Sequence, residues 1–199
     1  MAVISPDLLD YPAIRKPSPT ATTSFTSAPS STQFQAIYAE HLDLVWRSLR
    51  GLGVREASVE DAAQDVFLVV HRRFESFEAR SSFRTWLFGI VLRVARNHRR
   101  TDQRKGGLAP LDGVPEVADE GPGPHEEAVT AEALRDLSLA LDDLDEAKRE
   151  VFVLAELEQM CAPEIAETLG LNVNTVYSRL RAARSAFEAA VERKKGIRR

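Results

Sequence analysis

Residues 173–184 carry cationic and hydrogen-bonding side chains whose spacing places them on the outer face of one helix. Apolar residues of the same stretch recur at Val176, Leu180 and Ala183, which is the period of an amphipathic helix. Arginine neutralises phosphates, and amide and hydroxyl groups hydrogen-bond to base edges, so this face has the chemistry for nucleic acid. Its members are Asn174, Thr175, Tyr177, Ser178, Arg179, Arg181 and Arg184.

The residues in front of this face predict a helix-turn-helix. Ile165, Ala166 and Leu169 share one face of a short helix. Gly170 then suits a turn that needs positive φ, and Asn172 can cap the second helix. A helical hairpin inside an ordinary all-α core would have the same apolar spacing, but the arginines on its outer face favour DNA binding.

A second cationic helix is expected from residue 83 to about residue 104, with Ser82 as its N-cap. Phe83 and Trp86 could stack on exposed bases, but their spacing among leucine and isoleucine favours a place in the core. The polar side of this helix is a candidate surface for phosphates and bases, and it consists of Arg84, Arg93, Arg96, Asn97, His98, Arg99, Arg100 and Arg104.

Helices must position these two surfaces. Apolar periodicity predicts helices over residues 33–52 and 58–74, with Ser58 capping the second. Helical patterning returns near residue 126, and Asp145 is a further N-cap candidate.

Composition divides the chain into four parts. Residues 1–32 are half Ser, Thr and Pro and predict a disordered tail, and residues 106–125 predict a flexible acidic linker. The fold class is therefore all-α, with a three-helix domain at residues 33–105 and a four-helix domain at residues 126–195.

The charge distribution supports a polyanionic partner although the net charge is −4. Residues 71–105 contain ten Lys or Arg and three Asp or Glu, and residues 179–199 contain eight and two. Residues 106–147, between them, contain one Arg and twelve acids. Two basic blocks flanking an acidic connector suit a protein that touches nucleic acid at two places.

Several function classes are disfavoured by the sequence. A single cysteine excludes an intrachain disulfide, and there is neither a secretory signal nor an apolar run of about 18 residues, so we expect a cytoplasmic protein without direct membrane insertion. A Gly-rich phosphate loop, a zinc-ligand cluster and paired catalytic carboxylates are absent from the sequence. We therefore expect no enzyme, no cofactor and no metal site.

Taken together, the two halves resemble a known family. Residues 59–74 and 81–100 are similar to the second conserved region of bacterial RNA polymerase sigma factors, and residues 141–184 are similar to the fourth. Because no other conserved region lies between them, the resemblance is to the extracytoplasmic-function (ECF) group. It implies a protein that binds core RNA polymerase and directs promoter recognition, DNA melting and transcription initiation.

The resemblance also implies partners and residue roles. Polymerase would be contacted at its beta-prime clamp helices and beta flap, and an anti-sigma factor would mask the same surfaces. The polymerase-binding residues would be Asp61, Gln64 and Asp65. The minus-ten element would be captured and melted by Ser76, Phe77, Arg80, Arg84, Trp86, Arg93, Arg96, Asn97, Arg99 and Arg100. The minus-thirty-five element would be read by Val173, Asn174, Thr175, Tyr177, Ser178, Arg179, Arg181 and Arg184.

This sequence departs from the family pattern at several of these positions. Arg93 and Asn97 stand where the family usually has Asn and Asp. In the recognition helix, Asn174 replaces a frequent Gly and Tyr177 a frequent Lys. Cys161 replaces a Ser cap, so we expect a weaker helix start there and a small, half-buried thiol without a redox role.

Two other functions stay open at this stage. A response-regulator-type activator also ends in a helix-turn-helix, but it needs a domain of alternating strands and helices in front, which residues 33–105 do not predict. A module that only binds an anti-sigma factor would direct no transcription.

Overall fold

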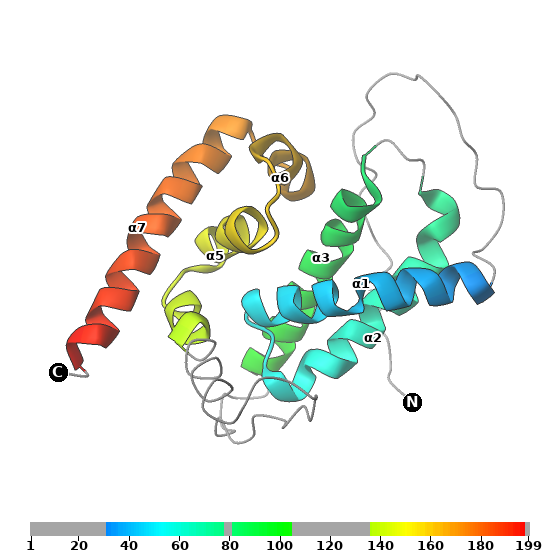
Figure 1. The fold of residues 1–199 in the computed structure, drawn as a ribbon, viewed down its shortest axis with the longest axis horizontal. Coiled ribbons are helices and arrows are strands. Elements are labelled where there is room, and N and C mark those ends of the chain that lie inside the picture. Colours follow the sequence, from blue (N-terminus) through cyan, green and yellow to red (C-terminus); the bar gives the residue numbers. More distant parts are fainter. Residues whose placement is uncertain (1–30, 78–80, 105–135, 198–199) are drawn as a thin grey trace, which may run out of the picture.

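The computed structural model of the chain describes residues 31–77, 81–104 and 136–197, and the regular structure in these ranges is helical throughout (Figure 1). The N-terminal domain consists of α1 (Ser31–Gly51), α2 (Glu56–Arg73), a short 3-10 turn η2 (Phe74–Ser76) and α3 (Phe83–Arg104). The C-terminal domain contains a helix at residues 136–142, α5 (Glu146–Phe152), a π-helical segment η3 (Val153–Leu157), α6 (Ala162–Leu169) and α7 (Val173–Ile197). The all-α prediction is confirmed for these residues.

The N-terminal domain packs as three helices because each carries one apolar face. α2 lies against both α1 and α3. Val45 and Leu49 of α1, Val66 of α2, and Phe88 and Val91 of α3 are fully buried at the centre of this packing. Burying such side chains contributes about 1.5–3 kcal/mol each, so the apolar spacing, rather than any one cap, holds the domain together.

The predicted helix starts are confirmed at three places in the structure. Ser82 Oγ accepts a hydrogen bond from the Thr85 backbone N at 3.1 Å. Asp145 Oδ1 accepts from the Lys148 backbone N at 2.9 Å, and Asn172 Oδ1 accepts from that of Asn174 at 2.8 Å. Hydrogen bonds from the side chain and backbone of Lys148 lower the pKa of Asp145.

The prediction that Ser58 caps the second helix is wrong. α2 begins at Glu56 after Arg55, and the Ser58 backbone N already donates to the Arg55 carbonyl at 2.8 Å. Gly53 adopts a φ of 82°, which lets the chain turn sharply after α1 and enter α2 early.

The start of α6 is also different from expectation. Cys161 is exposed rather than half-buried. Glu164 compensates for the missing Ser cap, because its Oε2 accepts a hydrogen bond from the Cys161 backbone N at 2.9 Å. Hydrogen bonding from the side chain and backbone of Cys161 lowers the pKa of Glu164.

The two domains pack directly against one another. α6 lies beside α3, and η3 lies beside α1 (Figure 1). Gly51 at the end of α1 allows the close approach, because a Cβ built there would lie 3.2 Å from a methyl of Leu157 and 3.4 Å from one of Val153. The buried apolar residues of both domains therefore form one continuous core.

Candidate nucleic-acid interface

The predicted outer face of the helix-turn-helix lies on α7. Val176, Leu180 and Ala183 are buried on the inner side, and Gly170 has the predicted positive φ of 64° in the turn before the helix. Tyr177 is 58% exposed and is among the most exposed large apolar side chains in the described part of the chain. The predicted residues of this face differ in exposure. The exposed ones are Asn174, Tyr177, Ser178, Arg181 and Arg184, and the half-buried ones are Val173, Thr175 and Arg179.

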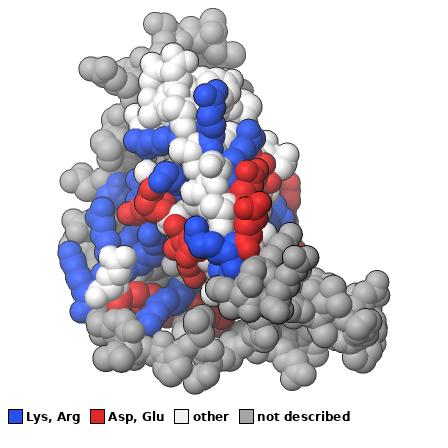
Figure 2. All heavy atoms as spheres, turned by 90° about the vertical axis from the view of Figure 1, so that its left-hand side faces the viewer, with Lys and Arg blue, Asp and Glu red and all other residues white. Residues whose placement is uncertain are grey.

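Acidic side chains stand among the basic ones on this side of the molecule (Figure 2). Arg184 Nε lies 2.8 Å from Glu156 Oε1 of η3, and Arg193 Nη2 lies 3.0 Å from Asp143 Oδ2. Both pairs lie within the C-terminal domain and are solvent-exposed, so each contributes only about 0–1 kcal/mol to stability. Arg184 is therefore paired within its own domain. Arg181, one turn closer to the start of α7, is also exposed.

The predicted polymerase-binding residues of α2 are not equivalent. Asp61 and Gln64 are exposed, and Leu68, one turn further along, is 43% exposed beside them. Asp65 points instead toward α3, where its Oδ2 lies 2.8 Å from His98 Nε2. Asp65 and His98 therefore join two helices, while Asp61 and Gln64 stand open to a partner.

Three of the predicted DNA-binding arginines of α3 are engaged by carboxylates of the other domain. We call these carboxylates, Glu146, Glu150 and Glu158, the seam carboxylates. Arg96 makes a bidentate pair with Glu150, with both N···O distances 2.6 Å, and this hydrogen bonding raises the pKa of Arg96. Arg99 Nη1 lies 3.4 Å from Glu146 Oε1.

Glu158 is the most enclosed of the seam carboxylates, with 0% of its side chain exposed. Arg47 of α1 donates from Nε and Nη2 at 3.3 and 3.2 Å, and Ser48 Oγ lies 2.8 Å from Oε1. Arg84 of α3 donates from Nη2 to the Glu158 backbone carbonyl at 2.6 Å and lies 3.4 Å from Oε2. Three side chains of the N-terminal domain, from α1 and α3, thus surround one carboxylate of the C-terminal domain.

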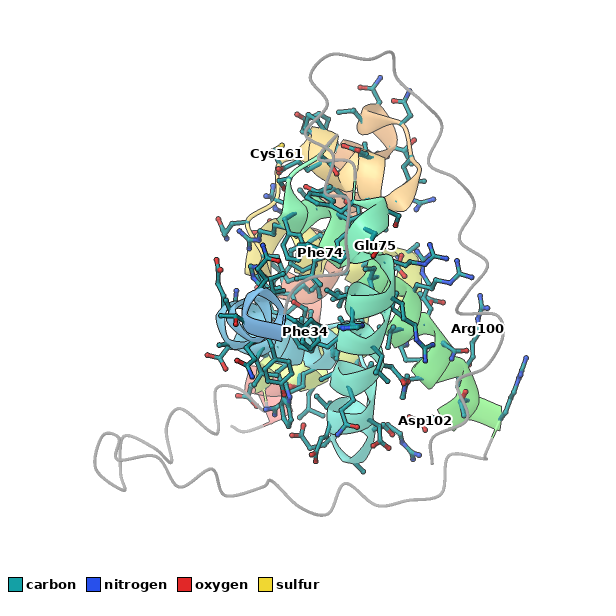
Figure 3. All side chains as sticks on the ribbon, turned by 90° about the vertical axis from the view of Figure 1, so that its right-hand side faces the viewer. Phe34, Phe74, Glu75, Arg100, Asp102 and Cys161 are labelled. Carbon is teal, nitrogen blue, oxygen red and sulfur yellow. The ribbon has the colours of Figure 1, made fainter. Side chains whose placement is uncertain are left out.

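The remaining minus-ten candidates lie at two separate places. Arg93 and Asn97 are half-buried and Arg100 is exposed along α3, whereas Ser76 is exposed at the other end of the domain. Figure 3 shows this separation, with Arg100 and Asp102 far from Phe74 and Glu75. Arg80 lies outside the described residues.

An aromatic cluster lies at the η2 end of α3. The ring centroids of Phe77, Phe83 and Trp86 lie 5.3–5.6 Å apart. Phe83 and Trp86 are half-buried rather than fully in the core. A hollow of about 520 Å³ opens here, lined by Ile37, Glu40, His41, Phe74, Phe77, Phe83 and Arg84. Its aromatic walls could stack on a base.

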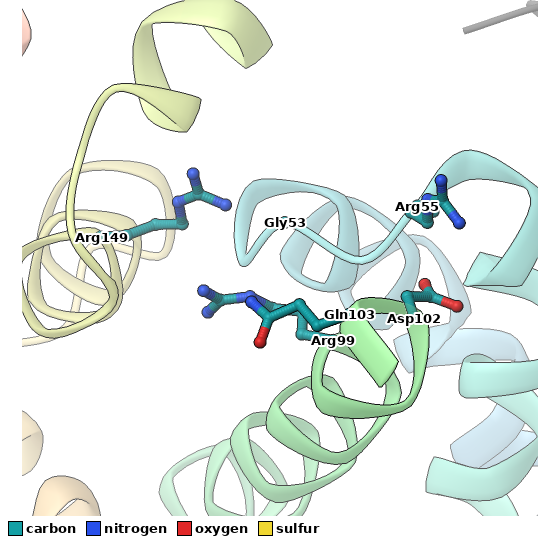
Figure 4. Close-up of a pocket in the computed structure, with 6 residues that line it drawn as sticks. All are labelled: Gly53, Arg55, Arg99, Asp102, Gln103 and Arg149. Carbon is teal, nitrogen blue, oxygen red and sulfur yellow. The ribbon is translucent and has the colours of Figure 1, made fainter. Parts of the chain in front are cut away.

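A second, polar hollow of about 280 Å³ lies where the two domains meet, lined by Gly53, Arg55, Arg99, Asp102, Gln103 and Arg149 (Figure 4). Arg149 is buried, and its Nε and Nη2 donate to the Leu141 carbonyl at 2.9 Å and to Asp142 Oδ1 at 3.0 Å. Burial lowers the pKa of Arg149, although Asp142 acts against the shift. A Cβ built on Gly53 would lie 1.8 Å from Arg149 Nη1, so this approach requires glycine.

Sequence reasoning missed the seam carboxylates and their partners Arg47 and Ser48. The pairs join residues 47 to 111 positions apart, which helical periodicity does not relate. The available signal was a glutamate at position 158 within the mainly apolar run from Val151 to Met160, because an ionised side chain in such a run requires a partner. The described residues contain no group of His, Cys, Asp or Glu placed to hold a metal ion, and none of their helices is long and apolar enough to cross a bilayer.

Two family models match the chain, one for each domain. The model of sigma-70 region 2 matches residues 37–105, and the model of sigma-70 region 4 matches residues 134–187. The RNA polymerase sigma factor CnrH of Cupriavidus metallidurans is 32% identical over 165 residues, which cover 80% of this chain and 86% of CnrH. The ECF RNA polymerase sigma-E factor of Escherichia coli K12 is 29% identical over 146 residues, covering 70% of this chain and 76% of its own length.

Solved structures agree with this relationship. CnrH in complex with the cytosolic domain of CnrY superposes with a TM-score of 0.63 at 28% identity, covering 83% of this chain and 92% of CnrH. The sigma factor RpoE of Bartonella quintana, in complex with the anti-sigma factor NepR, has a TM-score of 0.65 at 21% identity and shares the fold, covering 80% of this chain and 96% of RpoE.

Proposed function

The chain belongs to the ECF group of sigma-70 RNA polymerase sigma factors, and from that premise we propose that it binds core RNA polymerase, locates promoters and assists their opening. The observation that carries this function is the pairing of a region 2 domain with a region 4 domain in one chain, each with a cationic helix. Polymerase supplies the catalysis, and the protein acts where polymerase and the chromosome are, in the cytoplasm.

Core polymerase docks, in this proposal, on the exposed side of α2. Asp61 and Gln64 offer acceptor groups to basic residues of the clamp helices, and charge-assisted hydrogen bonds of this kind are strong. Leu68 adds apolar area beside them. Asp65 is committed to His98 and contributes by holding α2 against α3.

The minus-ten element is opened and held by the N-terminal domain. Extruding a base costs a few kcal/mol, and stacking in the aromatic hollow beside Phe77 and Phe83 offsets that cost. The arginines of α3 together with Asn97 hold the phosphates of the opened strand.

The minus-thirty-five element is read by α7 in the major groove. Asn174 and Ser178 are exposed near the start of the helix, where recognition helices contact base edges. Tyr177 presents apolar area suited to a thymine methyl or a sugar, and Arg179 and Arg181 supply phosphate contacts.

An anti-sigma factor is a further proposed partner. The related CnrH is seen with the cytosolic domain of CnrY, and this chain covers 92% of that CnrH chain. We propose that a comparable protein binds this chain and masks its polymerase-facing surfaces.

Run-off transcription tests the proposed function. Core polymerase free of any other sigma factor is incubated with a promoter library, with and without this protein. A sigma factor yields transcripts that depend on the protein in the absence of any other sigma factor, whereas an activator of response-regulator type yields none until one is added. Absence of any protein-dependent transcript with core polymerase alone would contradict the proposal.

A further inference from the structure

The polar hollow beside Gly53 has the chemistry of an oxyanion site. We call it the junction hollow, and it is lined by Gly53, Arg55, Arg99, Asp102, Gln103 and Arg149 (Figure 4). We propose that it binds the phosphate group of a small ligand, either inorganic phosphate or a nucleotide. The inference goes beyond the function proposed above and does not depend on it.

Two guanidinium groups converge in the junction hollow. Arg149 Nη1 lies where a Cβ on Gly53 would be, and Arg99 Nε lies 3.7 Å from the same point. Figure 4 shows the side chains of Arg99 and Gln103 extending from α3 toward Arg149. Burial lowers the pKa of Arg149, and the positive charge of Arg99 acts in the same direction. An anion held between the two groups relieves the repulsion between them.

Both arginines keep N–H donors for such an anion. Arg149 donates from Nε to the Leu141 carbonyl and from Nη2 to Asp142, and Nη1 has no acceptor within the described residues. Arg99 makes a loose pair with Glu146, in which Nη1 and Oε1 are 3.4 Å apart. Guanidinium N–H groups bind phosphate oxygens strongly, because both partners carry charge. The hollow therefore offers a phosphate group one charged donor from each domain.

The carboxylates that pair with these arginines are more exposed than the arginines themselves. The Arg149 side chain is 7% exposed and that of Asp142 is 64% exposed. The corresponding values are 16% for Arg99 and 50% for Glu146. Water screens an exposed charge more strongly than an enclosed one, so the two carboxylates offset the arginines incompletely. The interior of the hollow is consequently favourable for an anion.

The size and the remaining lining of the hollow define the ligand. Its volume of about 280 Å³ is just below the range of about 300–1,000 Å³ for pockets that enclose a drug-sized molecule. A phosphate group fits inside, and the rest of a nucleotide stays in solvent. Asp102 contributes a carboxylate to the lining, but Figure 4 shows it beside Arg55 and away from Arg149. The amide of Gln103 can donate a further hydrogen bond.

Isothermal titration calorimetry of the full chain with inorganic phosphate tests the site. The test variant is Gln103→Glu, because Gln103 is exposed and a carboxylate at this position repels phosphate. The matched control is Gln35→Glu, since Gln35 is also exposed and lies near the end of α1 that is remote from Gly53. The two variants have the same net charge, so nonspecific attraction of phosphate changes equally in both.

We expect the parent and Gln35→Glu to bind phosphate with the same Kd, and Gln103→Glu to bind it at least about tenfold more weakly. Circular dichroism checks that each variant is folded. If Gln103→Glu folds poorly, Gln103→Lys serves instead, and it should tighten phosphate binding. The same Kd in the parent and in the folded Gln103 variant would overturn the proposal. Absence of binding by the parent at phosphate concentrations up to about 10 mM would overturn it as well.

Three ligands distinguish the possible sources of the phosphate group. Inorganic phosphate, ADP and a dT20 single strand are titrated separately into the parent and into Gln103→Glu. Binding of phosphate or ADP that is weakened in the variant supports the proposal. Binding of dT20 alone would overturn it, because the hollow would then belong to the DNA-binding surface. Run-off transcription reports the sigma activity independently, so failure of the anion site and failure of the proposed function are distinguishable.

Discussion

α3 and α7 are both arginine-rich amphipathic helices, yet the structure treats their arginines differently. Arg84, Arg96 and Arg99 of α3 are paired with seam carboxylates of the other domain. On α7, Arg181 is exposed and Arg184 is paired only with Glu156 of its own domain. Arginines on two helices of the same kind therefore have different surroundings, since those of α3 take part in the contact between the domains and Arg181 of α7 stays at the surface.

The largest expected effect is on the free energy of unfolding, and it compares an arginine of α3 with an arginine of α7. Arg96→Ala leaves Glu150, which is 5% exposed, without its bidentate partner. Removing one member of a buried pair costs 3–5 kcal/mol, and partial exposure of Arg96 reduces the expected cost to about 2–3 kcal/mol. Arg181→Ala, on the open face of α7, should change the free energy of unfolding by less than about 0.5 kcal/mol. Urea denaturation measures both, and equal costs would remove the distinction between the helices.

A pair of glycines measures the steric fit between the two domains. Gly53 and Gly170 both have positive φ, but a Cβ overlaps Arg149 at Gly53 and meets nothing within 4 Å at Gly170. We expect Gly170→Ala to cost about 1 kcal/mol for the backbone alone and Gly53→Ala about 2–3 kcal/mol.

The double variant Gly53→Ala with Arg149→Ala should cost less than the sum of the single changes, since the overlap is gone. Thermal denaturation of the four variants measures the coupling. Additive costs at Gly53 and Arg149 would show that the two residues do not meet.

DNA binding by α7 should depend on which arginine is removed. Arg181→Ala is expected to weaken binding of duplex promoter DNA by polymerase holoenzyme by about 1 kcal/mol and to reduce the salt slope by about 0.9, the value for one lost phosphate contact. Arg184→Ala should have a smaller effect, because Arg184 must first leave Glu156. Fluorescence anisotropy over a KCl series measures both slopes, and a larger loss with Arg184→Ala would reverse this assignment.

The smallest expected effect concerns the cap of α5, the helix that carries Glu150. Asp145→Ala should cost about 1 kcal/mol at pH 7, and Asp145→Asn a few tenths, because Asn keeps the cap hydrogen bond. The pKa of Asp145 is lowered in the folded protein, so its charge stabilises the fold above the unfolded pKa of about 4. That contribution is lost as the pH falls through the lowered pKa.

Urea denaturation between pH 7 and pH 3 separates the two variants. The difference in stability between the parent and Asp145→Asn should shrink as the pH falls below about 4. A difference that stays constant over this range would show that the Asp145 charge is not what stabilises the start of α5.

Local features were predictable from the sequence, and the contact between the two domains was not. The caps at Ser82, Asp145 and Asn172 and the turn at Gly170 follow from residues within a few positions, so short-range rules are sufficient. Ser58 was misassigned because the tight turn at Gly53 starts α2 earlier than its polar pattern indicates.

The two cationic surfaces were identified correctly as helical faces. Which of their arginines pair with carboxylates was not predicted. Whether Arg96 is open or paired depends on Glu150, 54 positions away in another domain. Apolar periodicity describes which side of each helix is buried and carries no information on how two domains meet. The roles of these residues in binding DNA and polymerase remain predictions for the experiments above.

Arg84, Arg96 and Arg99 combine an ion pair between the domains with a proposed contact to DNA, and that combination limits how the protein can diverge. A substitution at any of the three should alter the proposed DNA contact and the packing of the two domains together. Asn97 and Arg100 lie on the same helix and do not pair with the seam carboxylates, so they can change without that second effect. New promoter preferences should therefore arise more readily at these positions, because a change at a paired arginine also costs stability.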